Sequence, residues 1–513
     1  MLLHQLVTVS EAVSATRKRL EKRRVLAALL REAGREQIAL VVSYLIGRLP
    51  QGRIGFGPAL LRDIGPGQAE RASLTLVDLD AWVDEFAAVS GKGAKATRRK
   101  KLEQLWVRAT ENEGRFLYAL LLGELRQGAL EGLLIDAIAE ATDVAAAQVR
   151  RATMLAGTPV PVAVAASCEG AAAVAAFRLR LMQGVQPMLA QPGELESCFS
   201  GDGEYMLEYK LDGARVQVHR RNEEVKIFSR QLHDVTRSLP ELVEMAQALP
   251  ANEFILDGEA IALREGGSPY PFQTTMRRFG RRSNVDEMRA QLPLSMFIFD
   301  CLHLDGEDLL DLPLFKRLEY LDDLAPALRP PRRQASSSDD ALAFLDAAFD
   351  AGHEGLMVKD LRSLYQAGSR GADWRKIKQV HTLDLVVLAA EWGSGRRQGW
   401  LSNLHLGARD ADDSFVMLGK TFKGLTDAML SWQTEQLLAR ETARDGHVVY
   451  VRPELMVEIA VNEIQRSPHY PAGLALRFAR VKAFREDKTA EEADTITAVQ
   501  ELFAKQGAVR EPD

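Results

Sequence analysis

The first 180 residues of the chain carry a helical pattern of apolar positions. Apolar side chains recur at spacings that mark one face of a helix, as at Leu20, Val25, Leu26, Leu29 and Leu30. Residues 117–125 and 145–155 repeat this pattern, and the alanine-rich residues 162–181 close the region. Alternating β-branched runs are few here. The pattern predicts an all-α domain over residues 1–181.

From residue 184 the pattern changes to short runs in which apolar and polar side chains alternate. These runs cover residues 205–210, 214–219, 225–228, 254–256, 296–300 and 356–359. Asp-Gly pairs close several of them, at 212–213, 257–258 and 305–306. Two strands joined by an Asp-Gly pair are typical of a β-hairpin. With helical stretches at 239–249 and 339–351, the pattern predicts an α+β domain over residues 182–380.

The last third of the chain is again rich in short strands. They are expected at residues 383–389, 404–406, 415–418, 448–451, 456–461 and 478–484, with one helix at 427–440. Several short strands and one helix over roughly 130 residues are typical of a small barrel of the oligonucleotide-binding type, the OB-fold. A helical tail is expected at 490–505. The pattern therefore predicts an all-β OB-fold domain over residues 381–513.

Length and composition indicate a soluble protein of several domains. The chain has 513 residues, more than one hydrophobic core usually holds, of which 46% are hydrophobic and 27% are charged. Its three cysteines, Cys168, Cys198 and Cys301, cannot form a four-cysteine zinc site and suit a reducing compartment. No apolar stretch reaches the roughly 20 residues that a membrane-spanning helix needs, and no export signal is recognisable. We therefore expect a cytoplasmic protein.

The charge of the chain is informative through its distribution. The net charge is −6, yet basic side chains gather at residues 17–24 (RKRLEKRR), at 92–101 (KGAKATRRKK), and at Arg277, Arg278, Arg281 and Arg282. Each cluster alone is more typical of a solvated face than of a nucleic-acid contact. The clusters indicate nucleic-acid binding only in combination with other features of the sequence. A local basic surface is enough to bind phosphate, so the negative net charge does not exclude such binding.

Residues 208–215 (EYKLDGAR) carry the clearest chemical signal. Lys210 is expected to end a strand, and Arg215 to begin the next one. A deprotonated lysine amine can attack phosphorus, and neighbouring cations depress the pKa of such an amine. We expect Arg215, the cations of residues 374–378 (WRKIK) and a divalent metal to supply the positive charge that lowers the pKa of Lys210.

The sequence contains no P-loop. The glycine-rich residues 393–399 are interpreted as a basic loop between strands.

Seven motifs in order resemble those of the ATP-dependent DNA ligases, a family of covalent nucleotidyltransferases. They are KLDGAR at 210–215, SR at 229–230, LDGE at 256–259, FIFD at 297–300, EGLMVK at 354–359, WRKIK at 374–378 and RFARVKAFREDK at 477–488. QPMLA at 186–190 and PFQ at 271–273 also match. SGKGA at 90–94 and GELRQG at 123–128 resemble the helical DNA-binding domain of archaeal and eukaryotic replicative ligases. The whole chain most closely resembles the B-type, three-domain ligases of bacteria.

The resemblance implies a role for each motif residue. Lys210 is expected to become adenylylated, Glu208 to bind the adenine amino group and Phe299 to stack on the adenine ring. Without the family, Glu208 reads as a salt-bridged strand residue and Phe299 as part of the core. Contacts with ribose and phosphate are implied for Arg215, Arg230 and Arg370, and neutralisation of the α-phosphate for Lys376 and Lys378.

The resemblance further implies a metal ion and a moving C-terminal domain. Glu259 and Glu354 are expected to bind Mg²⁺ or the ribose, and Lys359 could join either the ribose and metal contacts or the phosphate contacts. Arg485, Asp487 and Lys488 are expected to orient the pyrophosphate leaving group, which requires the C-terminal domain to close over the nucleotide.

The implied function is the ATP- and Mg²⁺-dependent sealing of nicks between a 5′-phosphate and a 3′-hydroxyl in duplex DNA. The intermediates are a lysyl-AMP and an adenylylated 5′-phosphate. We expect a monomer that encircles DNA, without a membrane partner, in the cytoplasm and on the nucleoid. DNA contacts are expected mainly to phosphate, from the basic clusters and from Arg396 and Arg397.

Other interpretations remain open at this point. An RNA ligase or a capping guanylyltransferase shares the lysine chemistry, but the long helical region and REDK at 485–488 favour a DNA ligase. An NAD-dependent ligase usually carries a four-cysteine zinc site, which this chain cannot form. A non-catalytic scaffold that binds DNA ends is disfavoured by the intact residues Lys210, Glu259, Glu354 and Lys376.

Overall fold

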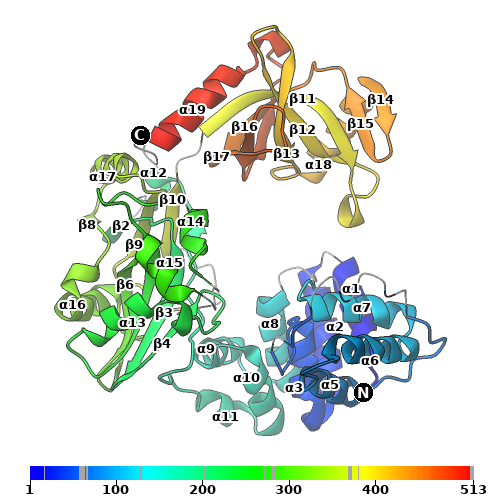
Figure 1. Ribbon diagram of the computed structural model, residues 1–513, viewed down its shortest axis with the longest axis vertical. Helices are drawn as coiled ribbons and strands as arrows, with labels where there is room; N and C mark the ends of the chain where they lie inside the picture. Colours follow the sequence, from blue (N-terminus) through cyan, green and yellow to red (C-terminus); the bar gives the residue numbers. More distant parts are fainter. Residues whose placement is uncertain are drawn as a thin grey trace.

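The protein is described here by a computed structural model, which covers residues 1–16, 18–52, 54–56, 60, 64, 67–125, 130–199, 203–270, 272–279, 284–367, 373–378 and 381–508. Three regions follow one another along an open arc (Figure 1). The helical N-terminal region forms one end, a middle region of strands and helices forms the back, and a β-rich C-terminal region forms the other end. Within the described residues, none of the helices combines the length and apolarity needed to cross a bilayer.

The helical region contains the expected amphipathic helices around one shared core. The helices are α1 (Leu3–Ala15), α2 (Arg19–Glu32), α3 (Gly34–Leu45), α5 (Leu76–Ala87), α6 (Ala94–Arg108), α7 (Glu111–Leu122), α8 (Leu130–Thr142), α9 (Ala146–Ala156), α10 (Pro159–Cys168) and α11 (Ala171–Ala175). Their apolar faces, among them Leu26, Leu79 and Leu117, are buried together. Sequence signals fix the ends of α7: Thr110 caps its start, and Gly123 ends it with a φ of 69°.

The alanine-rich residues 162–181 do not form one continuous helix. Helix α10 ends at Cys168, and α11 covers only Ala171–Ala175 before the chain leaves the helical conformation. Gly170 separates the two helices with a φ of 83°, a left-handed conformation that glycine adopts without steric cost.

The middle region is built on two five-stranded sheets, each with its own buried core, and a third buried cluster contains residues from both. The first has the order β1-β10-β9-β2-β8 and the second the order β4-β3-β5-β6-β7. The strands are β1 (Gln191–Pro192), β2 (Tyr205–Tyr209), β3 (Ala214–Arg221), β4 (Glu224–Ser229), β5 (Glu253–Ala262), β6 (Leu294–Leu304), β7 (Glu307–Asp308), β8 (Arg332–Ala335), β9 (Gly355–Asp360) and β10 (Trp374–Lys378). Helices cover them: α12 (Leu195–Cys198) and α17 (Ser338–Asp350) on the first sheet; α13 (Pro240–Gln247), α14 (Phe272–Met276), α15 (Val285–Gln291) and α16 (Leu314–Leu324) beside the second.

Two of the three Asp-Gly hairpins expected from the sequence are absent. Strands β2 and β3, which flank Asp212 and Gly213, belong to different sheets. Asp257 and Gly258 lie inside β5, which pairs on both edges, with β3 and β6. Only the pair at 305–306 turns the chain, between β6 and β7, where both residues have positive φ. Close packing explains the other glycines, because a Cβ would lie 2.5 Å from the carbonyl of Ala260 at Gly213, and 2.5 Å from that of Phe297 at Gly258.

The C-terminal region is a strongly curved antiparallel sheet. Its strands are β11 (His381–Trp392), β12 (Leu401–Arg409), β13 (Phe415–Thr421), β14 (Glu441–Asp445), β15 (Val448–Val451), β16 (Met456–Val461) and β19 (Arg480–Phe484), beside the small pair β17 (Glu463–Arg466) and β18 (Leu474–Arg477). The long strand β11 pairs first with β16 and then with β15. Residues after β13 reach back to β19, where the Val481 N–H donates to the Lys423 carbonyl (2.9 Å). This closure produces the expected small barrel.

The helices of the C-terminal region are α18 (Asp427–Leu438) and α19 (Ile496–Ala508). The expected tail helix at 490–505 is therefore split, with a short 3₁₀ turn at Ala490–Glu492 before α19 begins. Both Ile496 and Val499 of α19 are buried in the barrel core, so the tail belongs to this region.

The helical and middle regions share a buried seam. Met154 and Leu155 of α9 pack in one cluster with Val185, Met188 and Trp374. The Gln186 N–H donates to the Met154 carbonyl (3.0 Å), and Arg151 makes a two-point ion pair with Asp311 (2.9 and 2.6 Å). By contrast, no hydrogen bond or ion pair joins residues 381–508 to the described residues of the other two regions.

Candidate active site

Lys210 lies where the chain crosses from one sheet of the middle region to the other. It follows the last residue of β2, and its N–H donates to the Gly355 carbonyl (2.8 Å) at the start of β9. Its own carbonyl accepts the Glu354 N–H (3.2 Å). Four residues after Lys210, β3 begins in the second sheet. The crossing places the Lys210 amine between groups from both sheets.

The Lys210 amine is paired with a carboxylate that it shares with a second lysine. Glu354 accepts hydrogen bonds from Lys210 at Oε2 and from Lys378 at Oε1, the latter at 2.8 Å. All three side chains are largely buried, between 20% and 28% exposed. Although burial opposes it, the two ammonium groups hold the pKa of the Glu354 carboxyl well below its ordinary range.

Without nucleotide or metal, the pKa of Lys210 is raised rather than depressed. Burial lowers the pKa of the ammonium, but the nearby carboxylates of Glu354, Glu259 and Asp212 outweigh burial and raise it above its ordinary value. The cations expected to act on Lys210 are themselves neutralised: Arg215 is paired with Asp257 and Lys378 with Glu354. In this state Lys210 is protonated, and attack on phosphorus requires its proton to leave.

Glu259 is the carboxylate of the site that lacks a hydrogen-bond partner among the described residues. It lies on β5 directly opposite Arg215 of β3. Burial raises the pKa of Glu259 to about 7, although Lys210 and Arg215 act against this. Its oxygens are therefore suited to gain a cation. Glu354 fits a metal ion less well, because each of its oxygens already accepts from a lysine.

The described residues contain no ready-made metal site. No three His, Cys, Asp or Glu side chains are grouped there as candidate ligands. Mg²⁺ usually takes one or two carboxylates together with substrate phosphates and waters, so a dedicated protein cage is not needed.

Arg215 is fixed by four contacts to groups around it. Its Nε and one terminal nitrogen donate to the two oxygens of Asp257 (2.9 and 2.6 Å), and the other terminal nitrogen donates to the Met188 carbonyl (2.6 Å). The fourth contact is a long one to the Tyr365 hydroxyl (3.5 Å). That hydroxyl donates to Asp257 (2.7 Å) and accepts the Met188 N–H (3.1 Å). Arg215 is thus oriented by a network that begins in the segment leading out of the helical region.

Glu208, Lys359, Phe299 and Trp374 form a second cluster beside Lys210, drawn from both sheets. Phe299 and Trp374 meet edge to face, with ring centroids 6.1 Å apart. Glu208 is buried and paired through Oε2 with the ammonium of Lys359 (2.6 Å), while its Oε1 and the Trp374 indole nitrogen are buried without a partner. Buried polar atoms rarely remain unsatisfied, so an unfilled acceptor and an unfilled donor beside an aromatic ring fit the binding of a planar polar base.

The remaining predicted nucleotide contacts are only partly placed. Arg230 follows β4, is exposed, and makes no hydrogen bond or ion pair with the described residues. Lys376 and Lys378 alternate on β10, so they project to the same side of the sheet. Arg370 lies outside the described residues, as does Pro271 of the PFQ motif.

Arg485, Asp487 and Lys488 are not joined to the Lys210 site by any hydrogen bond or ion pair of the described residues. Arg485 makes a two-point pair with Asp487 (2.9 and 2.7 Å), and both Arg485 (3.2 Å) and Lys488 (2.5 Å) contact Asp384. Asp384 lies in β11, six residues after Lys378, which is at most roughly 20 Å of extended chain. These three residues are therefore tethered close to the site by sequence but are engaged elsewhere.

Sequence reasoning missed several residues of this arrangement. Asp257 and Trp374 lie inside recognised motifs but had no assigned role, while Tyr365 and Asp384 lie outside them. Asp257 could have been found, because a carboxylate beside Gly258 inside an apolar run is unusual for a strand interior. No local signal marks Asp384, since its partners follow about a hundred residues later.

Two exposed aromatic rings on the C-terminal region are a further feature that the sequence analysis did not single out. Phe422 and Phe478 are 55% and 54% exposed. Arg477 and Lys423 lie over the Phe478 ring, at 4.9 and 5.4 Å from its centroid, and the backbone of Phe478 has a φ of 57°. A non-glycine residue in this conformation is uncommon and points to a constrained position.

Comparisons with known proteins give a consistent picture. Residues 64–139 match the family model for the DNA ligase N terminus, 187–378 that for the ATP dependent DNA ligase domain, and 397–488 that for the ATP dependent DNA ligase C terminal region. A probable DNA ligase of Anaeromyxobacter sp. (strain Fw109-5) is 54% identical over 514 residues, 99% of each chain. One of Rhodococcus jostii (strain RHA1) is 51% identical over 98% of this chain and 100% of its own. The solved structure titled Pmar-Lig_PreS3 shares the fold, with a TM-score of 0.61 over 94% of this chain and 99% of its own at 17% identity.

Proposed function

The chain belongs to the ATP-dependent DNA ligase family and seals nicks in duplex DNA, and we propose that Lys210 carries the covalent intermediate of this reaction. The Lys210 amine attacks the α-phosphate of ATP, and pyrophosphate leaves. The adenylyl group then passes to the 5′-phosphate at the nick. Finally the 3′-hydroxyl attacks that activated phosphate, which forms the phosphodiester bond and releases AMP.

The observation that carries the assignment is the surroundings of Lys210. On one side lies a cluster with an unfilled acceptor, Glu208 Oε1, next to the Phe299 ring. On the other side lie Lys378, paired with Glu354, and the carboxyl of Glu259. A nucleotide placed with its base in the first group brings its phosphates toward the second. Charge that spreads over a transferring phosphoryl group is stabilised by such fixed cations.

Activation of Lys210 is proposed to follow from an exchange of partners. When triphosphate arrives, Lys378 and Lys376 turn to its oxygens, and Glu354 loses one of its two cations. Glu259 would hold Mg²⁺, and the bound ion would supply positive charge beside Lys210 that favours loss of the ammonium proton. Glu354 is then the carboxylate nearest to that proton.

The other nucleotide contacts are proposed as the resemblance implies them. Glu208 binds the adenine amino group, Phe299 stacks on the ring, and Arg215 and Arg230 contact the ribose and phosphates, with Arg370 beyond the described residues. Arg485, Asp487 and Lys488 orient pyrophosphate after the C-terminal region swings toward Lys210. Since Asp384 holds both cations of this set, closure exchanges an internal ion pair for contacts with the nucleotide.

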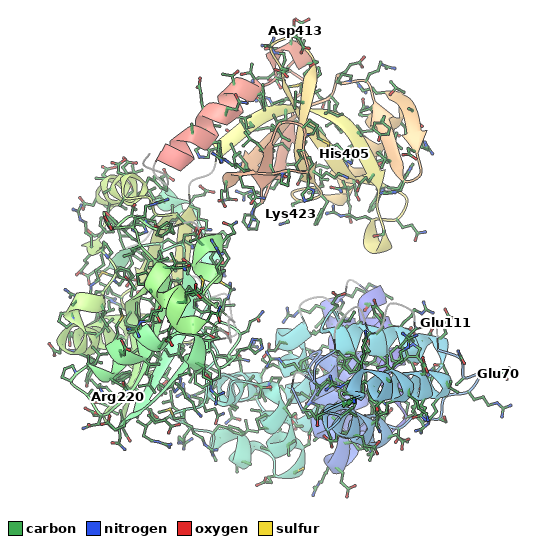
Figure 2. The ribbon with its side chains drawn as sticks, in the orientation of Figure 1. Glu70, Glu111, Arg220, His405, Asp413 and Lys423 are labelled. Atoms are coloured by element: carbon green, nitrogen blue, oxygen red, sulfur yellow. The ribbon has the colours of Figure 1, made fainter. Side chains whose placement is uncertain are left out.

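DNA is proposed to lie along the inner side of the arc. Figure 2 shows Lys423 on the side of the C-terminal region that faces the helical region, and Asp413 at its outer end. Lys423 lies beside the exposed Phe478, so this inner side offers cations and an aromatic ring together. With the basic helix α6 on the helical region, a monomer could encircle a duplex through phosphate contacts.

The proposed domain boundaries follow the same division. Residues 1–181 form the DNA-binding domain, 182–380 the adenylylation domain and 381–513 the OB-fold domain, and each contains one of the three matched segments. We place the enzyme in the cytoplasm, on the DNA of the nucleoid.

The test is covalent labelling of the protein by α-labelled ATP with Mg²⁺. Wild-type protein is expected to give a labelled band that nicked duplex DNA discharges, and Lys210→Ala to give none. Lys226→Ala, an exposed lysine on β4, serves as the control and should label normally. Labelling that persists in Lys210→Ala would show that another residue is the nucleophile.

A further inference from the structure

Lys359 is a buried lysine that ties the two sheets of the middle region together. Its side chain is 1% exposed, and its ammonium donates to the Glu208 carboxylate (2.6 Å) and to the Phe299 carbonyl (3.1 Å). It also lies over the rings of Phe299 (4.5 Å) and Trp374 (4.4 Å). Glu208 and Trp374 come from the first sheet and Phe299 from the second.

Strand register explains why these groups converge. Lys359 of β9 lies opposite Met206 of β2 and opposite Trp374 of β10. Glu208 is two residues beyond Met206, so it projects from the same face and lies diagonal to Lys359, within reach of a long side chain. The ammonium is therefore directed away from the phosphate-binding lysines of β10 and toward the base-binding residues.

The pairing leaves Glu208 with one occupied and one unoccupied oxygen. Lys359 takes Oε2, while Oε1 is buried and accepts no hydrogen bond. An ionised carboxylate only accepts hydrogen bonds, whereas a protonated one also donates. The 6-amino group of adenine donates, and the 6-oxo group of guanine accepts. The state of Oε1 thus decides which purine it can bind.

We propose that Lys359 determines base specificity, because it holds Glu208 ionised and in one orientation, so that Oε1 accepts from adenine and repels the oxo group of guanine. The inference rests on the proposed function, in which Glu208 binds the base. Lys359 acts through Glu208 and is a positioning residue.

Other charges around Glu208 do not replace Lys359. Arg332 of β8 lies opposite Glu208 but pairs with Asp322, and Asp300 of β6 pairs with Arg317. Burial, the largest effect, and Asp300 leave the pKa of Glu208 above its ordinary value, although Lys359 and Arg332 lower it. Removal of Lys359 therefore favours the protonated carboxyl, which can donate to guanine.

The experiment compares rates of covalent labelling by α-labelled ATP and GTP, as kcat/KM, between pH 6 and 9. Lys359→Met should lower the ATP/GTP ratio by roughly 10-fold or more near pH 7, since an unmatched polar pair in a closed site is costly. The ratio should recover as pH rises and Glu208 ionises. In the wild type, any loss of selectivity should begin at a lower pH than in Lys359→Met.

Two further variants, Glu208→Gln and Glu208→Gln/Lys359→Met, test whether Lys359 acts through the Glu208 carboxylate or only through packing of its own side chain. An amide both donates and accepts at every pH, so both variants should show the same low ratio without the pH dependence of Lys359→Met. The double variant also removes both charges, so no unpaired carboxylate is left buried. Its folding should therefore be less disturbed than that of Lys359→Met. Sealing of pre-adenylylated nicked DNA reports whether each variant is folded.

Lys316→Met is a matched control. Lys316 also lies over a phenylalanine ring, Phe315 (5.5 Å), and pairs with a glutamate, Glu319 (2.8 Å), but on the surface of α16. The ATP/GTP ratio of Lys316→Met should equal that of the wild type. An unchanged ATP/GTP ratio in Lys359→Met, or a further drop when Glu208→Gln is combined with it, would overturn the inference. Absence of labelling in the wild type itself would instead contradict the proposed function.

Discussion

At the scale of single residues, the carboxylates near Lys210 differ in their partners and therefore in their protons. Glu354 carries two ammonium groups and stays ionised, whereas Glu259 has no hydrogen-bond partner among the described residues. Burial raises the pKa of Glu259 to about 7. The free protein thus holds a proton on Lys210 and, near neutral pH, partly on Glu259.

The raised pKa of Glu259 makes stability depend on pH in a defined direction. An unfolded chain ionises this carboxyl near its ordinary value of 4.5, so between about 4.5 and 7 the unfolded chain has lost a proton that the folded protein retains. The contribution of Glu259 to stability is therefore complete below 4.5 and falls as pH rises through 7, by at most about 3 kcal/mol.

Glu259→Gln should remove the loss of stability that ionisation of Glu259 causes as pH rises. Without nucleotide or metal, the melting temperature of the variant relative to wild type is expected to be higher at pH 8 than at pH 5, as measured by scanning calorimetry. Glu265 lies in the exposed loop after β5. The difference in melting temperature between Glu265→Gln and wild type should not change with pH. A relative melting temperature of Glu259→Gln that is constant with pH would contradict the assignment.

At the scale of elements, strand β5 shows how one glycine shapes the site. Gly258 separates Asp257, which orients Arg215, from Glu259, which faces Lys210 and the proposed metal. The register between β5 and β6 shifts at Asp257 and Gly258, so the ladder is irregular there. The absent side chain lets β6 approach, because a Cβ would lie 2.5 Å from the Phe297 carbonyl and 2.8 Å from Ile298 Cδ1.

Gly258→Ala should therefore push β5 away from β6 and displace the carboxylates on either side. We expect a loss of about 1–3 kcal/mol in stability, together with slower adenylylation at saturating ATP. Gly266→Ala is the matched control, because a Cβ there meets no atom within 4 Å. The two measurements are thermal unfolding and labelling by ATP; wild-type behaviour of Gly258→Ala in both would contradict this account of β5.

At the scale of the whole molecule, the regions are joined unequally. A buried seam fixes the helical region to the middle region and continues into the Met188 contacts of Arg215. The C-terminal region instead keeps Arg485 and Lys488 paired with its own Asp384. The proposed adenylylation step needs these residues at Lys210, whereas the proposed path of the DNA runs along the inner side of the same region.

Arg485→Ala should accordingly separate the steps of the reaction. Labelling by ATP is expected to fall by roughly 100-fold or more, because a cation on the leaving group is lost, while sealing of pre-adenylylated nicks should be largely retained. Arg409→Ala removes an ion pair with Asp413 at the outer end of the region and should affect neither step. Equal losses in both steps for Arg485→Ala would indicate a structural role.

The sequence by itself determined the classes of the three regions and the chemistry of the motifs, because periodicity and residue type are local properties. Helices such as α7, with its capping threonine and terminal glycine, and the position of Lys210 next to the end of a strand are read from neighbouring positions.

Only the tertiary structure decided which strands pair and which charges meet. Asp-Gly pairs favour turns locally, yet strand pairing and close packing placed Gly213 at a crossing between sheets and Gly258 inside β5. The partner that keeps Lys210 protonated follows it by 144 positions, and Lys359 lies 151 positions after Glu208. Electrostatic energies depend on distance in space, so proton positions and the proposed base specificity follow from the fold and cannot be seen in the local sequence.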